Sequence, residues 1–127
     1  FSALIRDSIT RKIILEYSGL FLFPSYVFDE LSDHKQELLS KSGLSPLDFN
    51  KLLSLLLQKV VIVPESVLLS HKTEALGIAQ GIDLNDVLFI ACVLAHPNSV
   101  LWSEDKALKR QSRIKVLNTA ELLQILD

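Results

Sequence analysis

Short, continuously apolar runs separated by longer helical segments are the feature that most constrains the fold of this chain. The runs span residues 20–23, 60–63 and 100–102, and a fourth strand-like segment at 114–117 is apolar except for Lys115. Strands with one face in water alternate apolar and polar residues, whereas strands buried on both faces are apolar throughout. Buried strands that alternate with helices favour a parallel sheet covered on both faces. The sequence therefore predicts an α/β fold, a three-layer α/β/α sandwich with a central parallel sheet, in one domain over residues 1–127.

Helices are predicted between the apolar runs by their spacing and their starting residues. Apolar residues recur every three or four positions over residues 2–17 and again over 66–80, where we expect a break near His71. Residues 87–95 are apolar all round, so we expect the helix that contains them to be the most buried one. Four residues whose side chains accept hydrogen bonds from a first helical turn are predicted N-caps: Ser25, Ser45, Asp83 and Asn118.

Composition excludes several classes of protein. The charged fraction of 22% argues against disorder, and the longest apolar run, residues 87–95, is far shorter than the roughly 20 residues of a membrane span. The single cysteine, Cys92, excludes an internal disulfide and fits a reducing compartment, and no secretory signal is visible, so we expect a cytoplasmic protein. The net charge of −2 means that nucleic-acid binding would need a local basic patch.

Acidic residues fall where the predicted strands end and the helices begin. They are Glu30, Asp83, Asp86 and Asp105. Functional groups of open α/β sheets gather outside the carboxyl ends of the strands, so we expect these carboxylates to converge on one rim. Crowded carboxylates repel one another unless a cation neutralises them, and hard oxygen ligands suit Mg²⁺ or Mn²⁺. Such an ion activates water and stabilises charge on a phosphodiester, which nearby cations would hold: Lys106, Lys109 and Arg110.

Each of these residues also has a simpler interpretation. Asp83 and Asp86 suit a helix start, and Asp105 can cap the short helix that follows it. Glu30 can be an ordinary solvent-exposed residue of a helix. The basic residues can likewise be a solvated surface, because no aromatic side chains interleave with them as in a base-stacking platform. The pattern alone therefore leaves a metal site and a set of helix caps both open.

Four stretches of the chain resemble the PIN-domain family, most closely its small prokaryotic members, which include the VapC-type toxins. They are Phe-Ser-Ala-Leu-Ile-Arg-Asp-Ser at the start, Val-Phe-Asp-Glu-Leu at 27–31, Asp-Leu-Asn-Asp-Val-Leu-Phe-Ile-Ala at 83–91 and Trp-Ser-Glu-Asp-Lys at 102–106. The resemblance implies an α/β/α fold and Mg²⁺- or Mn²⁺-dependent endoribonuclease activity. It implies that a metal-activated water hydrolyses the RNA phosphodiester.

The resemblance also assigns roles to individual residues. Glu30, Asp86 and Asp105 would be catalytic metal ligands, Asp83 an additional ligand, and the Ser103 hydroxyl would orient a carboxylate or the attacking water. It suggests an antitoxin-like protein partner and a homodimer. The leucines of residues 52–57 exceed what one buried face needs, which also favours a dimer.

The chain departs from the family pattern at its start. In the family, a first acid ends an N-terminal strand just before the first helix. Here the helix-like segment begins at Phe1, so we expect the given residues to lack that strand and its aspartate. Asp7 lies too far along the helix to replace this acid. Two alternatives follow: the parent protein is a nuclease, or the chain is a non-catalytic PIN-like module that binds RNA or a protein partner. A third is an unrelated α/β domain whose acids only cap helices.

Overall fold

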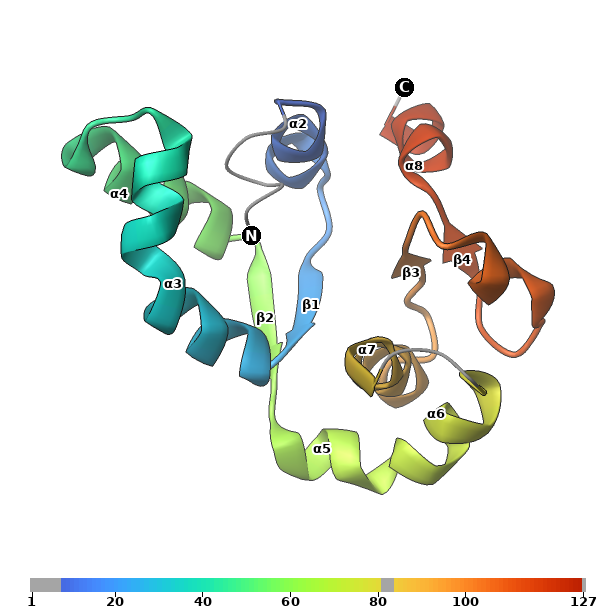
Figure 1. Cartoon of the computed structure of the whole chain (residues 1–127). Coiled ribbons are helices and arrows are strands. Elements are labelled where there is room, and N and C mark those ends of the chain that lie inside the picture. Colours follow the sequence, from blue (N-terminus) through green and yellow to red (C-terminus); the bar gives the residue numbers. More distant parts are fainter. Residues whose placement is uncertain (1–7, 81–83, 127) are drawn as a thin grey trace.

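The computed structural model describes residues 8–80 and 84–126 of the chain. Helices outnumber strands in it, and one or more helices separate each strand from the next, as the sequence predicts (Figure 1). The elements, in chain order, are α2 (Ser8–Glu16), β1 (Phe21–Pro24), α3 (Tyr26–Ser42), α4 (Pro46–Leu57), β2 (Val60–Val63), α5 (Glu65–Ser70), α6 (Lys72–Ile78), α7 (Leu84–Ala95), β3 (Leu101–Trp102), the 3-10 helix η1 (Lys106–Arg110), β4 (Val116–Leu117) and α8 (Thr119–Leu126).

The described strands form two separate parallel pairs. β1 pairs with β2 from Phe21 opposite Val60 to Pro24 opposite Val63. β3 pairs with β4, with Leu101 opposite Val116. The α/β class and the parallel pairing are therefore confirmed, whereas one central sheet between two helical layers is not shown by the described residues. In Figure 1, α3 and α4 lie beside β2, while β3, β4 and α8 lie on the other side of β1.

Local capping signals fix the starts of two helices. The Ser45 hydroxyl accepts a hydrogen bond of 3.2 Å from the Asp48 N–H, and Pro46 occupies the first position of α4. At the start of α8, the Asn118 side chain accepts from the Glu121 N–H at 2.9 Å, and the Glu121 carboxylate accepts from the Asn118 N–H at 3.0 Å. These reciprocal bonds make a capping box, so both predicted caps are confirmed.

Two other predicted caps have different outcomes. Ser25 precedes α3 with helical backbone angles and makes no side-chain capping bond, so this prediction is wrong. The reason is that Ser25 continues directly from β1, and its N–H donates to the Val63 carbonyl of β2. Asp83 lies outside the described residues. The expected break near His71 is confirmed, because this residue separates α5 from α6.

The buried side chains fall into two clusters. The first surrounds α7, whose Val87, Ile90, Ala91, Cys92 and Val93 are all buried, so the prediction that this is the most buried helix is confirmed. The second cluster joins α2, α3 and α4 through Ile14, Leu38, Phe49, Leu53 and Leu56. Within the described ranges, no helix has the length and apolarity that crossing a bilayer requires.

Candidate functional site

The predicted metal ligands lie on three different elements. Glu30 is exposed on α3, the helix that follows β1. Asp86 is partly buried in the first turn of α7. Asp105 is exposed between β3 and η1. Asp83 belongs to the segment that the structure does not describe.

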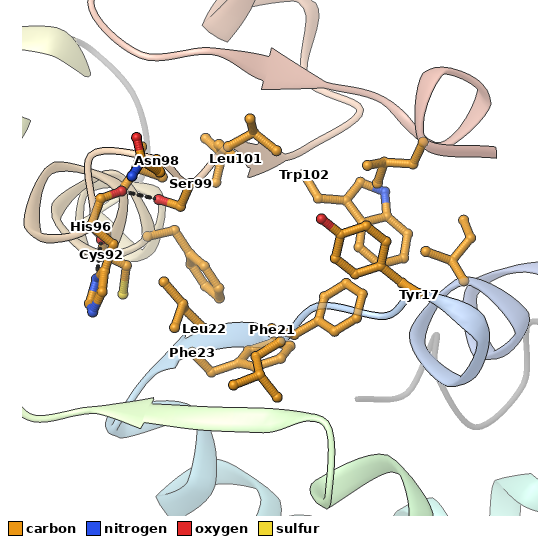
Figure 2. Close-up of a pocket in the computed structure, with 16 residues that line it drawn as sticks. Tyr17, Phe21, Leu22, Phe23, Cys92, His96, Asn98, Ser99, Leu101 and Trp102 are labelled. Atoms are coloured by element: carbon orange, nitrogen blue, oxygen red, sulfur yellow. Dashed lines mark hydrogen bonds between the residues drawn. The ribbon is translucent and has the colours of Figure 1, made fainter. Parts of the chain in front are cut away.

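Strand direction decides whether these carboxylates meet. The expected common rim requires β1 and β3 to run the same way. Figure 2 shows that they run in opposite directions: Tyr17, Phe21 and Phe23 follow one another from right to left, whereas Ser99, Leu101 and Trp102 follow one another from left to right. The carboxyl ends of β1 and β3 therefore lie at opposite ends of the space between them.

The described residues do not gather into a metal site. In the parts of the chain at 8–80 and 84–126, no three side chains of the types His, Cys, Asp and Glu come together closely enough to hold one. Carboxylate oxygens are the right donors for Mg²⁺ or Mn²⁺, but Glu30 and Asp105 follow strands of different sheets. The described residues therefore do not fit a bound ion as they stand, and the metal-ligand roles remain a prediction.

Asp105 acts as a helix cap. Its Oδ1 accepts a hydrogen bond of 2.9 Å from the Ala107 N–H at the start of η1. The Ser103 Oγ accepts one of 3.1 Å from the Asp105 N–H, which tightens the turn that leaves β3. The capping interpretation of Asp105 is thus confirmed, and Ser103 contacts the backbone of Asp105. A capping carboxylate still has free lone pairs, so this role leaves other bonds open.

Glu104 belongs to a hydrogen-bonded chain that the sequence analysis missed. The Trp102 Nε1–H donates to the Thr119 Oγ1 at 3.0 Å, and the Thr119 hydroxyl and N–H both donate to the Glu104 carboxylate. These bonds from Thr119 lower the pKa of Glu104. The partners are 15 residues apart, so no local spacing in the sequence could have indicated this network.

The basic residues after β3 are partly engaged in ion pairs. The Lys109 ammonium contacts the Glu121 carboxylate, and its hydrogen bond lowers the pKa of Glu121. The Arg113 guanidinium contacts the Glu74 carboxylate of α6. Lys106 and Arg110 are exposed on η1. Of the three predicted phosphate-binding residues, Lys109 therefore already has an acidic neighbour.

An apolar pocket of about 560 Å³ lies between the two sheets. Figure 2 shows Phe21, Leu22 and Phe23 of β1 along one wall and Ser99, Leu101 and Trp102 along the other. Residues of α7 close one end, among them Cys92, whose pKa burial raises to about 12. The sequence predicts these side chains to be strand and helix interior, because a continuous apolar run looks the same whether or not a further element covers it.

Comparison with known proteins identifies one family. A family model described as PIN domain matches residues 1–126, nearly the whole chain. No curated protein and no solved structure matches significantly. The family match agrees in extent with the resemblance seen in the sequence, which also ran over essentially the entire chain.

Proposed function

The chain belongs to the PIN-domain family, whose members are generally nucleases that use divalent metal ions, and from this we propose that it is a metal-dependent endoribonuclease. The observation that carries the proposal is the match of the family model over residues 1–126. The proposed substrate is RNA, the proposed ion is Mg²⁺ or Mn²⁺, and the proposed location is the cytoplasm. A protein partner such as an antitoxin, or a second copy of the chain, belongs to the same proposal.

Among the proposed metal ligands, Asp86 has the position that best supports the proposal of a metal site. It lies in the first turn of α7, at the end of the most buried helix, and is itself partly buried. A carboxylate in the first turn of a helix lies near the positive end of the helix dipole, which favours negative charge there. Glu30 and Asp105 complete the proposed ligand set, with Asp83 as an additional ligand and Ser103 as a positioning residue.

Phosphate binding is proposed for the exposed face of η1. Lys106 and Arg110 are exposed there, and a polyanion gains affinity from each cation that it contacts. The pair between Lys109 and Glu121 is on the surface, where ion pairs contribute little to stability. An RNA phosphate can therefore replace Glu121 as the partner of Lys109 at little cost.

Catalysis by this set requires Glu30, Asp86 and Asp105 to lie close together on one rim. In the described residues, Glu30 and Asp105 follow strands that run in opposite directions across the pocket. We propose that the nuclease becomes competent only when these carboxylates lie on one rim with Asp86.

Substitution of Asp86 by Asn tests the nuclease proposal. The change keeps the shape of the side chain and removes its charge, so we expect Mn²⁺-dependent cleavage of a labelled single-stranded RNA to fall by about 100-fold or more while the fold is retained. Asp48→Asn is the matched control, because Asp48 is an acidic residue in the first turn of another helix, α4. Absence of Mn²⁺-dependent cleavage by the unmutated chain, or equal rates for Asp86→Asn and the unmutated chain, contradicts the proposal.

A non-catalytic module that binds RNA or a protein partner is the second candidate. The observation that favours it is the separation of Glu30 from Asp105 in the described structure, since no three such groups gather there. A Mn²⁺ titration followed by calorimetry distinguishes the two candidates. The nuclease requires a saturable site that Asp86→Asn weakens, whereas the module binds Mn²⁺ no better than an ordinary acidic surface does.

A further inference from the structure

A second, smaller pocket lies where the parallel strands β1 and β2 end, and we call it the β1–β2 pocket. β1 ends at Pro24 and β2 ends at Val63. The lining comes from the helices that follow these ends and from α7, and it includes Tyr26, Asp29, Glu65, Leu69, Lys72 and Leu88. Ligands of open α/β sheets bind outside the carboxyl ends of the strands, which is where this pocket lies.

Three charged side chains of the β1–β2 pocket are available to a ligand. Asp29 of α3 and Glu65 of α5 are exposed, and Lys72 at the start of α6 is partly buried. Among the residues of ranges 8–80 and 84–126, none forms an ion pair or a side-chain hydrogen bond with any of these three. The pocket therefore offers two carboxylates and one ammonium group that the described structure does not use.

Apolar side chains form other parts of the wall. Leu69 is 54% exposed, and Leu88 is partly buried. The Tyr26 ring packs edge-to-face against the Phe89 ring, with 6.4 Å between the ring centroids, which holds Tyr26 in position. The pocket volume is about 220 Å³, below the roughly 300–1,000 Å³ typical of sites for drug-sized ligands. Such a pocket suits one flat ring system such as a nucleobase.

The charges of the pocket select the chemistry of its occupant. Two carboxylates repel a phosphate group and accept hydrogen bonds, so the occupant must be a donor toward Asp29 and Glu65. The Lys72 ammonium repels a cation such as an arginine side chain, and it needs an acceptor. The occupant must therefore present donors and an acceptor side by side without carrying a positive charge.

Guanine is the nucleobase that meets this requirement. Its Watson–Crick edge carries two adjacent donors, N1–H and the N2 amino group, beside the O6 acceptor. Adenine, cytosine and uracil each present one donor group on that edge. Sequence-specific recognition of RNA uses this edge of unpaired bases together with contacts from aromatic side chains to the base.

We propose that the β1–β2 pocket binds a guanine base of single-stranded RNA. Asp29 and Glu65 accept from the N1–H and the N2 amino group, Lys72 donates to O6, and Tyr26 and Leu88 contact the base. The inference rests on the proposed function, because it takes RNA as the ligand. It adds to that function a preference for one base.

The position of the pocket relates this base to the bond that is cut. Asp29 directly precedes Glu30 on α3, and Leu88 follows Asp86 by two residues on α7. The pocket thus adjoins two of the proposed catalytic residues. We therefore expect the bound guanosine to lie next to the scissile phosphodiester.

Binding of short RNAs in EDTA tests the inference without metal-dependent cleavage. The probes are three fluorescein-labelled hexamers with five uridines and either guanosine, inosine or adenosine at the fourth position. Inosine keeps the O6 and N1–H of guanosine and lacks its N2 amino group. Fluorescence anisotropy is expected to show about tenfold or tighter binding of the guanosine hexamer than of the adenosine hexamer, with the inosine hexamer between them.

Neutral variants of the two carboxylates identify the site. Asp29→Asn and Glu65→Gln are each expected to reduce the preference for guanosine over adenosine by about fivefold or more. Asp33→Asn is the matched control, because Asp33 is exposed one turn further along α3 and does not line the pocket. All three positions are exposed, so the variants are expected to fold, which circular dichroism checks.

Cleavage in Mn²⁺ distinguishes failure of this inference from failure of the proposed function. We expect the unmutated chain to cut beside the guanosine and Asp29→Asn to lose that preference. Cleavage with no preference among the hexamers overturns the guanine site and leaves the nuclease standing. Guanosine-selective binding without cleavage overturns the nuclease and supports the guanine site.

Four binding results would overturn the inference. They are no binding of any hexamer, equal affinities for the guanosine and adenosine hexamers, and equal effects of Asp29→Asn and Asp33→Asn. The fourth is saturable binding of the amide of N-acetylarginine that Glu65→Gln weakens, without selection among the hexamers. That outcome identifies a cationic side chain of a protein partner as the occupant.

Discussion

At the residue scale, Thr119 connects β3 to α8 through side-chain hydrogen bonds. Its hydroxyl accepts from the Trp102 indole and donates to the Glu104 carboxylate, and its N–H donates to the same carboxylate at 2.7 Å. Hydrogen bonds to an ionised acceptor are stronger than those between neutral groups. The Trp102 ring that lines the pocket is thus held on its polar side by a residue at the start of a helix.

The lowered pKa of Glu104 predicts a pH-dependent contribution to stability. Because the folded-state pKa lies below the ordinary value of 4.5, ionised Glu104 stabilises the fold above about pH 4.5, and this contribution is lost as pH falls through the folded-state pKa. We expect Glu104→Gln to lower the free energy of unfolding at pH 7, and the difference from the unmutated chain to shrink below pH 4.5.

Urea denaturation at a series of pH values measures this difference. Glu16→Gln is a suitable control, since Glu16 is an exposed carboxylate at the end of α2, remote in the sequence from Thr119. A Glu104→Gln difference that stays constant from pH 7 to pH 3 would show that the hydrogen bonds from Thr119 do not favour the charged form.

At the scale of the element, the helices are defined by their own ends while the strands depend on their neighbours. The Ser45 cap and Pro46 set the start of α4, and Gly43 ends α3 with a positive φ of 70°, which glycine adopts without steric cost. β3 and β4 are two residues each, too short for local preference to define them. Their existence depends on pairing with each other across the sheet.

The Ser45 cap gives a prediction about the stability of α4. Ser45→Ala removes the oxygen that accepts from the Asp48 N–H, so we expect the free energy of unfolding to fall by about 1 kcal/mol. Ser54→Ala is the control, because Ser54 is exposed inside the same helix, where alanine is the better helix former. Equal urea midpoints for the two variants would mean that the cap does not determine where α4 begins.

At the scale of the whole molecule, the pocket lies between two buried clusters. Leu22 and Phe89 pack against the cluster around α7, whereas Phe21 and Trp102 pack against the cluster of α2, α3 and α4. All four side chains line the pocket, and the Phe21 and Trp102 rings lie 6.1 Å apart. Residues of both clusters therefore meet at the walls of the pocket.

The second cluster can be tested by a pair of neighbouring leucines. Leu56 is fully buried, so Leu56→Ala leaves a cavity and is expected to lower the free energy of unfolding by about 2–5 kcal/mol. Leu55 is 51% exposed on the same helix, and its substitution by alanine is expected to cost about 0.5 kcal/mol or less. Thermal or urea denaturation measures both. Similar losses for the two variants would contradict the observed orientation of α4.

The sequence by itself determined the local structure of this protein. The caps at Ser45 and Asn118, the break at His71 and the burial of α7 all depend on residues within a few positions of one another. The family resemblance was likewise carried by short motifs in order, and the family match over residues 1–126 agrees with it. Such signals can be read because the interactions behind them are local.

Only the tertiary structure decided how the strands are arranged. An apolar run indicates that a strand is buried. It does not indicate which strand lies beside it or in which direction the neighbouring strand runs. The opposite directions of β1 and β3 separate Glu30 from Asp105 and open the pocket between the two sheets. These features depend on contacts between residues far apart in the chain, such as Phe21 with Trp102, and no spacing within one segment encodes such contacts.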